Sequence, residues 1–120
     1  MQTKETKIKH RLMISDDAYR SVVNGIAALS IHTRKFESPS TLFIFALNNN
    51  ITPSEMEKVH FSTANFDGDN KVHLNLPSTI KDQLDSLKAN LLSLTGRQWL
   101  LRDVLVLLAF AVSQRFSGLR

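Results

Sequence analysis

Cysteine is absent from this 120-residue chain. Its absence excludes disulfide bonds, thiol catalysis and zinc sites built from cysteine, and it agrees with a reducing, cytoplasmic setting. Long apolar runs are also absent: the longest, Val104 to Val112, has nine residues, against the roughly 18 that a membrane span requires. The polar start from Met1 to Lys7 lacks the apolar core of a signal peptide. We therefore expect a cytoplasmic protein without a membrane partner.

Residue patterns that carry catalysis or bind metals are missing as well. The chain has no motif that pairs a nucleophile with a base, no glycine-rich phosphate loop, and no cluster of carboxylates outside residues 49–70. Its four histidines are scattered and make no recognisable metal spacing. Asp67-Gly68-Asp69-Asn70 resembles the start of a calcium loop, but Ser78 stands where the closing Glu belongs. The sequence predicts no enzyme, no cofactor and no metal site.

What the chain does have is an uneven distribution of charge around a net charge of +4. Residues 1–11 contain four basic and one acidic residue, for a net charge of +3, and residues 97–120 contain the same numbers. Residues 49–70 have the opposite sign, with one basic and four acidic residues and a net charge of −3. The two basic segments are suited to a polyanionic partner, which the middle segment would repel.

A second positive feature is an internal repeat. Residues 9–16, Lys-His-Arg-Leu-Met-Ile-Ser-Asp, align without a gap to residues 71–78, Lys-Val-His-Leu-Asn-Leu-Pro-Ser, at an offset of 62 positions (71 minus 9). Each segment alternates apolar with basic or polar residues, as a half-buried strand does, and each leads into a helix start. A repeated unit of this size cannot easily bury its apolar face alone, so we expect the two copies to share one core.

The same order of elements follows in both copies. In the first, Ser15 is expected to cap a helix that ends near residues 33–35, and Ser38 with Pro39 begins a second helix that is apolar on all sides and ends at residues 48–50. In the second, Ser78 is expected to cap an amphipathic helix whose apolar face includes Leu94, and a last, buried helix runs from about residue 97 to 116. We predict a first copy at residues 1–48, a linker at 49–70 and a second copy at 71–120.

This arrangement resembles the ribbon-helix-helix family of DNA-binding proteins, the Arc and MetJ repressor superfamily. The resemblance depends on the strand at residues 71–78 and on residues 95–103, Thr-Gly-Arg-Gln-Trp-Leu-Leu-Arg-Asp, which are similar to the start of that family's second helix. It implies a mainly α-helical fold with a two-stranded antiparallel β-ribbon, in which tandem ribbon-helix-helix copies form a pseudo-two-fold dimer within one chain. An intertwined homodimer of two chains would use the same residues and stays open.

The resemblance also implies how DNA is contacted. The ribbon enters the major groove, and its outward side chains read the bases while the apolar ones face the helices. By the alternation of the two strands, the expected base-reading residues are Lys9, Arg11, Met13, Lys71, His73 and Asn75. The second helices are expected to contact phosphates with their N-termini, assisted by nearby basic residues. The expected phosphate contacts are Lys4, Lys7, Arg34, Lys35, Ser40, Thr41, Arg97, Gln98 and Trp99.

The function expected from these residues is sequence-specific binding of double-stranded DNA. Single-chain tandem members of the family resemble both transcriptional regulators and the accessory proteins of plasmid conjugation and T-DNA transfer, so both roles are open. Further copies of the protein on DNA, or other DNA-processing proteins, are candidate additional partners. The alternative is a protein-interaction module, similar to an antitoxin, that binds a partner through Trp99 or residues 115–120 without specific DNA binding.

Overall fold

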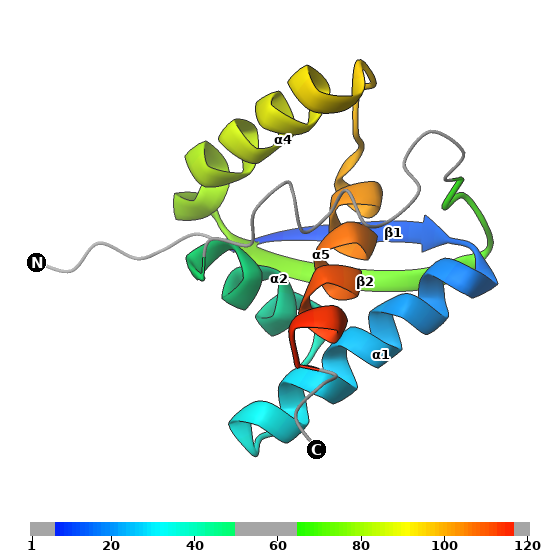
Figure 1. The fold of residues 1–120 in the computed structure, drawn as a ribbon, viewed down its shortest axis with the longest axis vertical. Helices are drawn as coiled ribbons and strands as arrows, with labels where there is room; N and C mark the ends of the chain where they lie inside the picture. The colour runs from blue at the N-terminus through cyan, green and yellow to red at the C-terminus, as the bar shows by residue number, and fades with distance from the viewer. Residues whose placement is uncertain (1–6, 50–64, 117–120) are drawn as a thin grey trace, which may run out of the picture.

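The computed structural model describes residues 7–49 and 65–116. Lys4 and most of the predicted linker lie outside these residues. The described part is mainly helical with a two-stranded antiparallel sheet (Figure 1). None of its helices combines the length and hydropathy that crossing a bilayer requires.

The order of elements follows the predicted repeat. The first half contains strand β1 (Lys7–Ile14), helix α1 (Asp16–Thr33) and helix α2 (Pro39–Asn48). The second half contains strand β2 (Asn70–Pro77), the short 3-10 helix η2 (Ser78–Ile80), helix α4 (Lys81–Thr95) and helix α5 (Leu101–Phe116).

The helices of the first half begin where the sequence predicts. The Ser15 hydroxyl accepts a hydrogen bond from the Ala18 N–H at 3.1 Å and caps α1. At α2, Ser38 and Thr41 cap each other's backbone N–H groups with their hydroxyls, and Pro39 occupies the first turn. Short-range hydrogen bonding therefore determines both starts.

The loop between α1 and α2 is held by side-chain hydrogen bonds. The Thr33 hydroxyl donates to a carboxylate oxygen of Glu37 at 2.6 Å, and the Glu37 N–H donates to the Ser30 hydroxyl at 3.0 Å. The hydrogen bond from Thr33 is the main reason why the pKa of Glu37 lies below its ordinary value. These bonds fix the chain between the end of one helix and the start of the next.

The helices of the second half begin later than predicted. Ser78 opens η2 and makes no side-chain cap for α4, which starts at Lys81. The last helix begins at Leu101, whereas the sequence suggests a start near residue 97. Its first bond is donated by the Val104 N–H to the Leu100 carbonyl at 3.0 Å, so residues 97–99 form a connection between α4 and α5.

The register of the ribbon matches the internal repeat. Arg11 lies opposite His73, its counterpart at the offset of 62 positions. The same offset relates Lys9 to Lys71 and Met13 to Asn75, and the register pairs Lys9 with Asn75 and Met13 with Lys71. A two-fold rotation about an axis through the Arg11–His73 pair therefore relates each residue of β1 to its counterpart on β2 at the offset of 62 positions.

The inner face of the ribbon covers the core, as the alternation predicts. Val72, Leu74 and Leu76 are buried, and Ile14 closes the same face at the end of β1. Helix α5 lies in the centre of the molecule (Figure 1), and its residues 104–109, 111 and 112 are all buried. A helix that is apolar on all sides has its most favourable place there.

Helices α1 and α5 pack against each other extensively and very closely. A Cβ atom added to Gly25 would lie 2.6 Å from the Ala109 carbonyl oxygen and 2.9 Å from the Ala109 Cβ. The absence of a side chain at Gly25 is thus what allows the two backbones to approach at this crossing.

The second half packs differently from the first. At the offset of 62 positions, Leu87 stands where the first half has Gly25, and Leu47 corresponds to Ala109. Helix α4 lies well apart from α1 in Figure 1, and its described contacts with α2 are much less extensive than those between α1 and α5. Leu94, which the sequence assigns to the buried face of α4, is 53% exposed. The positions that correspond to Gly25 and Ala109 thus carry larger side chains in the second half, where the extensive packing of α1 against α5 has no described counterpart.

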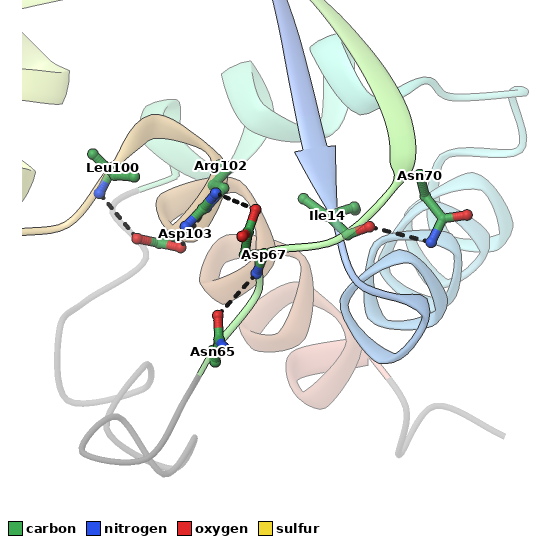
Figure 2. A network of polar contacts seen from close by, with 7 residues as sticks. All are labelled: Ile14, Asn65, Asp67, Asn70, Leu100, Arg102 and Asp103. Atoms are coloured by element: carbon green, nitrogen blue, oxygen red, sulfur yellow. Dashed lines mark hydrogen bonds and ion pairs between the residues drawn. The ribbon is translucent and has the colours of Figure 1, made fainter.

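Polar contacts attach the chain before β2 to the junction of β1 and α1 (Figure 2). The Ser15 N–H donates to the Phe66 carbonyl at 2.8 Å. The Asn70 side-chain amide donates to the Ile14 carbonyl at 3.2 Å, as Figure 2 shows, and to a carboxylate oxygen of Asp16 at 2.8 Å. Gly68 lies so close that an added Cβ would meet the Ser15 Cα at 2.4 Å. These contacts hold the beginning of β2 beside the end of β1.

Candidate nucleic-acid interface

The outer face of the ribbon brings together the side chains that the sequence assigns to base reading. Because residues directly opposite each other point to the same face, the register groups three from each strand. All are exposed except Met13, which is partly buried. The group consists of Lys9, Arg11, Met13, Lys71, His73 and Asn75.

This face carries positive charge without nearby compensation on the strands. Lys7, Lys9, Arg11 and Lys71 are exposed, and neither strand contains an acidic residue. None of the four forms an ion pair with a carboxylate of the described residues. The unpaired cations create a positive potential along the ribbon, which attracts polyanions.

The N-terminus of α2 lies beside one end of the ribbon. The Ser40 hydroxyl accepts a hydrogen bond from the Asn75 N–H at 2.8 Å, which satisfies a donor on the edge of β2. Ser40, Thr41, Asn75 and Lys7 line a recess of about 730 Å³ between α2, the ribbon and the start of α4. The first turn of α2 contains no acidic residue. The structure thus places three expected phosphate contacts, Lys7, Ser40 and Thr41, together.

The N-terminus of α5 has a different electrostatic character. Asp103, only 3% exposed, accepts a hydrogen bond from the Leu100 N–H at 3.1 Å. The Arg102 guanidinium donates to Asp103 at 3.3 Å and to Asp67 at 2.9 Å (Figure 2). A buried carboxylate in the first turn satisfies the helix end internally and opposes the approach of a second anion.

The expected phosphate contacts Arg97, Gln98 and Trp99 lie in the connection before α5 and not in its first turn. Trp99 is 4% exposed, and the Arg97 guanidinium lies over its ring at 4.2 Å from the centroid. The Trp99 side chain therefore belongs to the core, and the expected contact of this residue with phosphate, through a backbone N–H, stays a prediction. Gln98 is exposed and lines a smaller recess with Leu92 and Leu100. The expected role of residues 97–99 requires that they form the first turn of the helix. They lie before it, because α5 begins at Leu101.

Arg34 and Lys35 are remote from the ribbon. They follow the C-terminal end of α1, which points away from both strands (Figure 1). Arg34 adopts a left-handed conformation, with φ of 60°, where the helix ends. Arg34 and Lys35 are near Ser40 in sequence, but they lie at the end of α1 and Ser40 lies at the start of α2. The loop from residue 34 to 38 connects these two places, so only Ser40 reaches the end of the ribbon.

The two ends of the ribbon differ in charge. Lys7 and Lys9 lie at the end beside α2, where Lys81 is paired with Asp85 at 2.8 Å and Asp82 follows on α4. At the opposite end, the cations Arg20, Lys71 and Arg102 are outnumbered by carboxylates. These acidic residues are Asp16, Asp17, Asp67, Asp69 and Asp103. A phosphate backbone is therefore attracted more strongly to the end beside α2.

The carboxylate of Asp103 gives a direct test of the α5 N-terminus. Replacing Asp103 by Ala leaves the Leu100 N–H without its acceptor and removes a partner of Arg102, so we expect the free energy of unfolding to fall by about 1–2 kcal/mol. Urea unfolding followed by circular dichroism measures the change. The control is Asp85→Ala, which removes an exposed ion pair and should change stability by less than about 0.5 kcal/mol. Equal effects of the two substitutions would contradict a structural role for Asp103.

Two features of this interface were not anticipated from the sequence. One is the hydrogen bond from Asn75 to Ser40, which joins residues 35 positions apart and has no sequence signal. The other is the acidic cap of α5, whose signal is the aspartate three residues after Leu100. Within the described residues, no three histidine or acidic side chains gather as a metal site. Comparison with protein-family models, curated proteins and solved structures finds no match to this chain.

Proposed function

We propose that this protein binds double-stranded DNA sequence-specifically by inserting its β-ribbon into the major groove. The observation that carries the proposal is the outer face of the ribbon, where exposed cations and hydrogen-bonding side chains alternate with the apolar residues of the core. The major groove is wide enough for a two-stranded ribbon and presents a distinct pattern of donors and acceptors for each base pair.

The internal symmetry supports a tandem ribbon-helix-helix arrangement within one chain. The half-turn about the Arg11–His73 pair relates the two strands at the same offset at which the sequence repeats. Helix α5 of the second half packs against α1 of the first, so each half depends on the other for burial of its apolar residues. One chain then supplies the ribbon that a dimer of single-copy chains would otherwise form.

The two strands differ, so the proposed target is asymmetric. Arg11 can donate two parallel hydrogen bonds to guanine, and Asn75 can pair with adenine in a similar way. Met13 offers only an apolar contact, for instance to a thymine methyl group. Because Arg11 faces His73 across the centre of the ribbon, no palindromic sequence satisfies both strands equally.

Phosphate contacts in this proposal are concentrated at one end of the site. Lys7, with Ser40 and Thr41 at the N-terminus of α2, faces the backbone there. The other end, with its excess of aspartates, contributes less. This contrast adds a second source of asymmetry to the one that comes from the bases.

Specific DNA binding suits two biological roles, that of a transcriptional regulator and that of an accessory factor of DNA transfer. A regulator would bind a site that overlaps a promoter, whereas an accessory factor of DNA transfer would bind beside a transfer origin. A neighbouring gene for a relaxase or coupling protein favours the second role. The alternative interaction module would use Trp99, which is buried, or the chain end at residues 115–120, of which 117–120 lie outside the described residues.

Selection from a library of random duplexes tests the proposal. At about 150 mM salt we expect enrichment of one asymmetric motif. Arg11→Ala should weaken binding to that motif by about 1–3 kcal/mol and relax the preference at one base pair, because it removes the bidentate donor. Sequencing of the bound fraction and titration of the enriched duplex measure both effects.

Two further variants serve as controls for this experiment. Asn75→Ala should relax a different base pair, whereas Lys7→Ala should weaken binding to all sequences and flatten the salt dependence by about one unit. A selection without enrichment, or a motif that neither Arg11→Ala nor Asn75→Ala alters, would mean that the strands do not read bases. The interaction module would then be the better proposal.

A further inference from the structure

Helix α1 carries an apolar stripe on the side that faces away from the core. Its buried residues are Ala18, Val22, Gly25 and Leu29. Tyr19, Val23, Ala27 and Ile31 recur every four residues and form one continuous row, which runs from the flank of the helix at Tyr19 to its outer side at Ile31. Tyr19 and Val23 are 44% and 45% exposed and Ile31 is 77% exposed. Large apolar side chains gathered in one row on a surface helix indicate a contact surface.

The C-terminal end of this stripe is hollowed. Ile31 and Phe36 line a recess of about 260 Å³ together with Ser30, Arg34 and Lys35. Phe36 is fully exposed, so nothing in the described chain covers it. The recess has apolar walls and basic residues at its rim. An aromatic side chain with a polar tip, such as a tyrosine, suits such a place.

The two ends of α1 carry opposite charges. Asp16 and Asp17 lie in its first turn, and Arg34 and Lys35 follow its last turn. Arg20 is 3.8 Å from Asp17 and partly offsets the acidic end, and the Glu37 carboxylate, which accepts a hydrogen bond from Thr33 and interacts with Lys35, partly offsets the basic end. The stripe is therefore acidic at one end, apolar in the middle and basic at the other.

We propose that α1 binds α1 of a second copy of this chain, with the two helices antiparallel about a two-fold axis near Val23 and Ala27. In this arrangement Tyr19 of each copy enters the recess beside Ile31 of the other, and Asp17 faces Lys35. The axis repeats every contact, as a two-fold interface requires. The apolar row, the recess and the charges all fit this one orientation, whereas a parallel pairing would bring like charges together.

The size of the surface determines the strength of this association. Helix α1 has 18 residues, so its outer face is about 27 Å long and about 10 Å wide, or about 300 Å² in each copy. A stable interface usually buries about 800 Å² in each partner. We therefore expect a weak, reversible dimer. The contact needs no DNA and does not depend on the proposed function.

Sedimentation equilibrium of the full chain without DNA, from about 10 µM to about 1 mM, tests the inference. We expect a monomer–dimer equilibrium that Val23→Asp weakens about tenfold or more, because the new charge lies beside the axis in both copies. Asn90→Asp adds the same charge to the exposed side of α4 and should leave the equilibrium unchanged. Circular dichroism checks that each variant keeps its helices.

An exchange of charges between positions 17 and 35 tests whether the two α1 helices are antiparallel. It also tests the dimer independently if Val23→Asp disturbs the helix itself. Asp17→Lys alone and Lys35→Glu alone should each weaken the dimer, because each brings like charges together. The double variant should restore it, because lysine at position 17 then faces glutamate at position 35. A chain that stays monomeric to about 1 mM, or a dimer that ignores Val23→Asp and both single reversals, would overturn the proposal.

Discussion

Replacement of Lys7, Lys9, Arg11 and Lys71 by glutamine is expected to lower the affinity for the selected DNA duplex by about 1,000-fold or more at about 150 mM salt. Each cation contributes about 1–2 kcal/mol through a phosphate or base contact, and a factor of ten corresponds to about 1.4 kcal/mol. The four side chains are exposed and form no described ion pairs. Their replacement should therefore leave the fold intact.

The salt dependence of binding gives a second measurement on the same variant. The slope of log affinity against log salt concentration should become shallower by about one unit if only Lys7 neutralises a phosphate while Lys9, Arg11 and Lys71 read bases, and by about three to four units if all four cations neutralise phosphates. Fluorescence anisotropy of a labelled duplex at several salt concentrations provides these slopes. Near-identical thermal unfolding of variant and parent would exclude loss of the fold as the cause.

A charge-matched control separates the ribbon from generic basic attraction. Replacement of Arg20, Arg34, Lys35 and Lys88 by glutamine removes the same charge from the helices and their ends. We expect less than about a tenfold loss of affinity, because these residues lie away from the outer face of the ribbon. Similar losses in the two variants would show that binding follows net charge, and would argue against the ribbon as the interface.

Gly25→Ala is expected to destabilise the protein by about 1–3 kcal/mol. In an exposed helix the same change usually stabilises by up to about 1 kcal/mol, because alanine has the higher helix propensity. Here the added Cβ would lie 2.6 Å from the Ala109 carbonyl oxygen, an atom of the α5 backbone. To relieve that contact, α1 and α5 must move apart and loosen the packing around them.

Urea unfolding measures this effect, with Asn24→Ala as the matched control. Asn24 is the exposed neighbour of Gly25 on the same helix, so its substitution should be neutral or slightly stabilising. Removal of the Ala109 side chain in the double variant Gly25→Ala, Ala109→Gly should restore little, because the carbonyl oxygen remains. Stabilisation by Gly25→Ala alone would contradict the close crossing of α1 and α5.

The two halves of the molecule pack unequally, and Gly25 and Leu87 mark the difference. The repeat predicts two similar packing arrangements, yet in the described part of the chain α1 packs extensively against α5, whereas α4 makes few contacts with α2. The residues at corresponding positions differ in size, with Gly25 and Ala109 where α1 crosses α5 and Leu87 and Leu47 at the equivalent positions of α4 and α2. A repeat in the order of elements thus does not require a repeat in helix packing.

Local sequence patterns account for the two strands, for the starts of α1 and α2 and for the two faces of the ribbon. Alternation within each strand decides which side chains share a face, because strand geometry has a period of two residues, and Lys9, Arg11 and Met13 follow it. Short-range capping decides the starts of α1 and α2 at Ser15 and Ser38. The uninterrupted apolar content of residues 104–112 decides that α5 lies inside.

Only the tertiary structure decided which distant groups meet. The burial of Trp99, the exposure of Leu94 and the distance of Arg34 and Lys35 from the ribbon depend on where α4 and α1 lie. Asp103 caps α5, Arg102 bridges Asp103 and Asp67, and these carboxylates make the two ends of the ribbon unequal. Local periodicity contains no information on such contacts, because they arise from the crossing of helices, which depends on side-chain volume at a few positions.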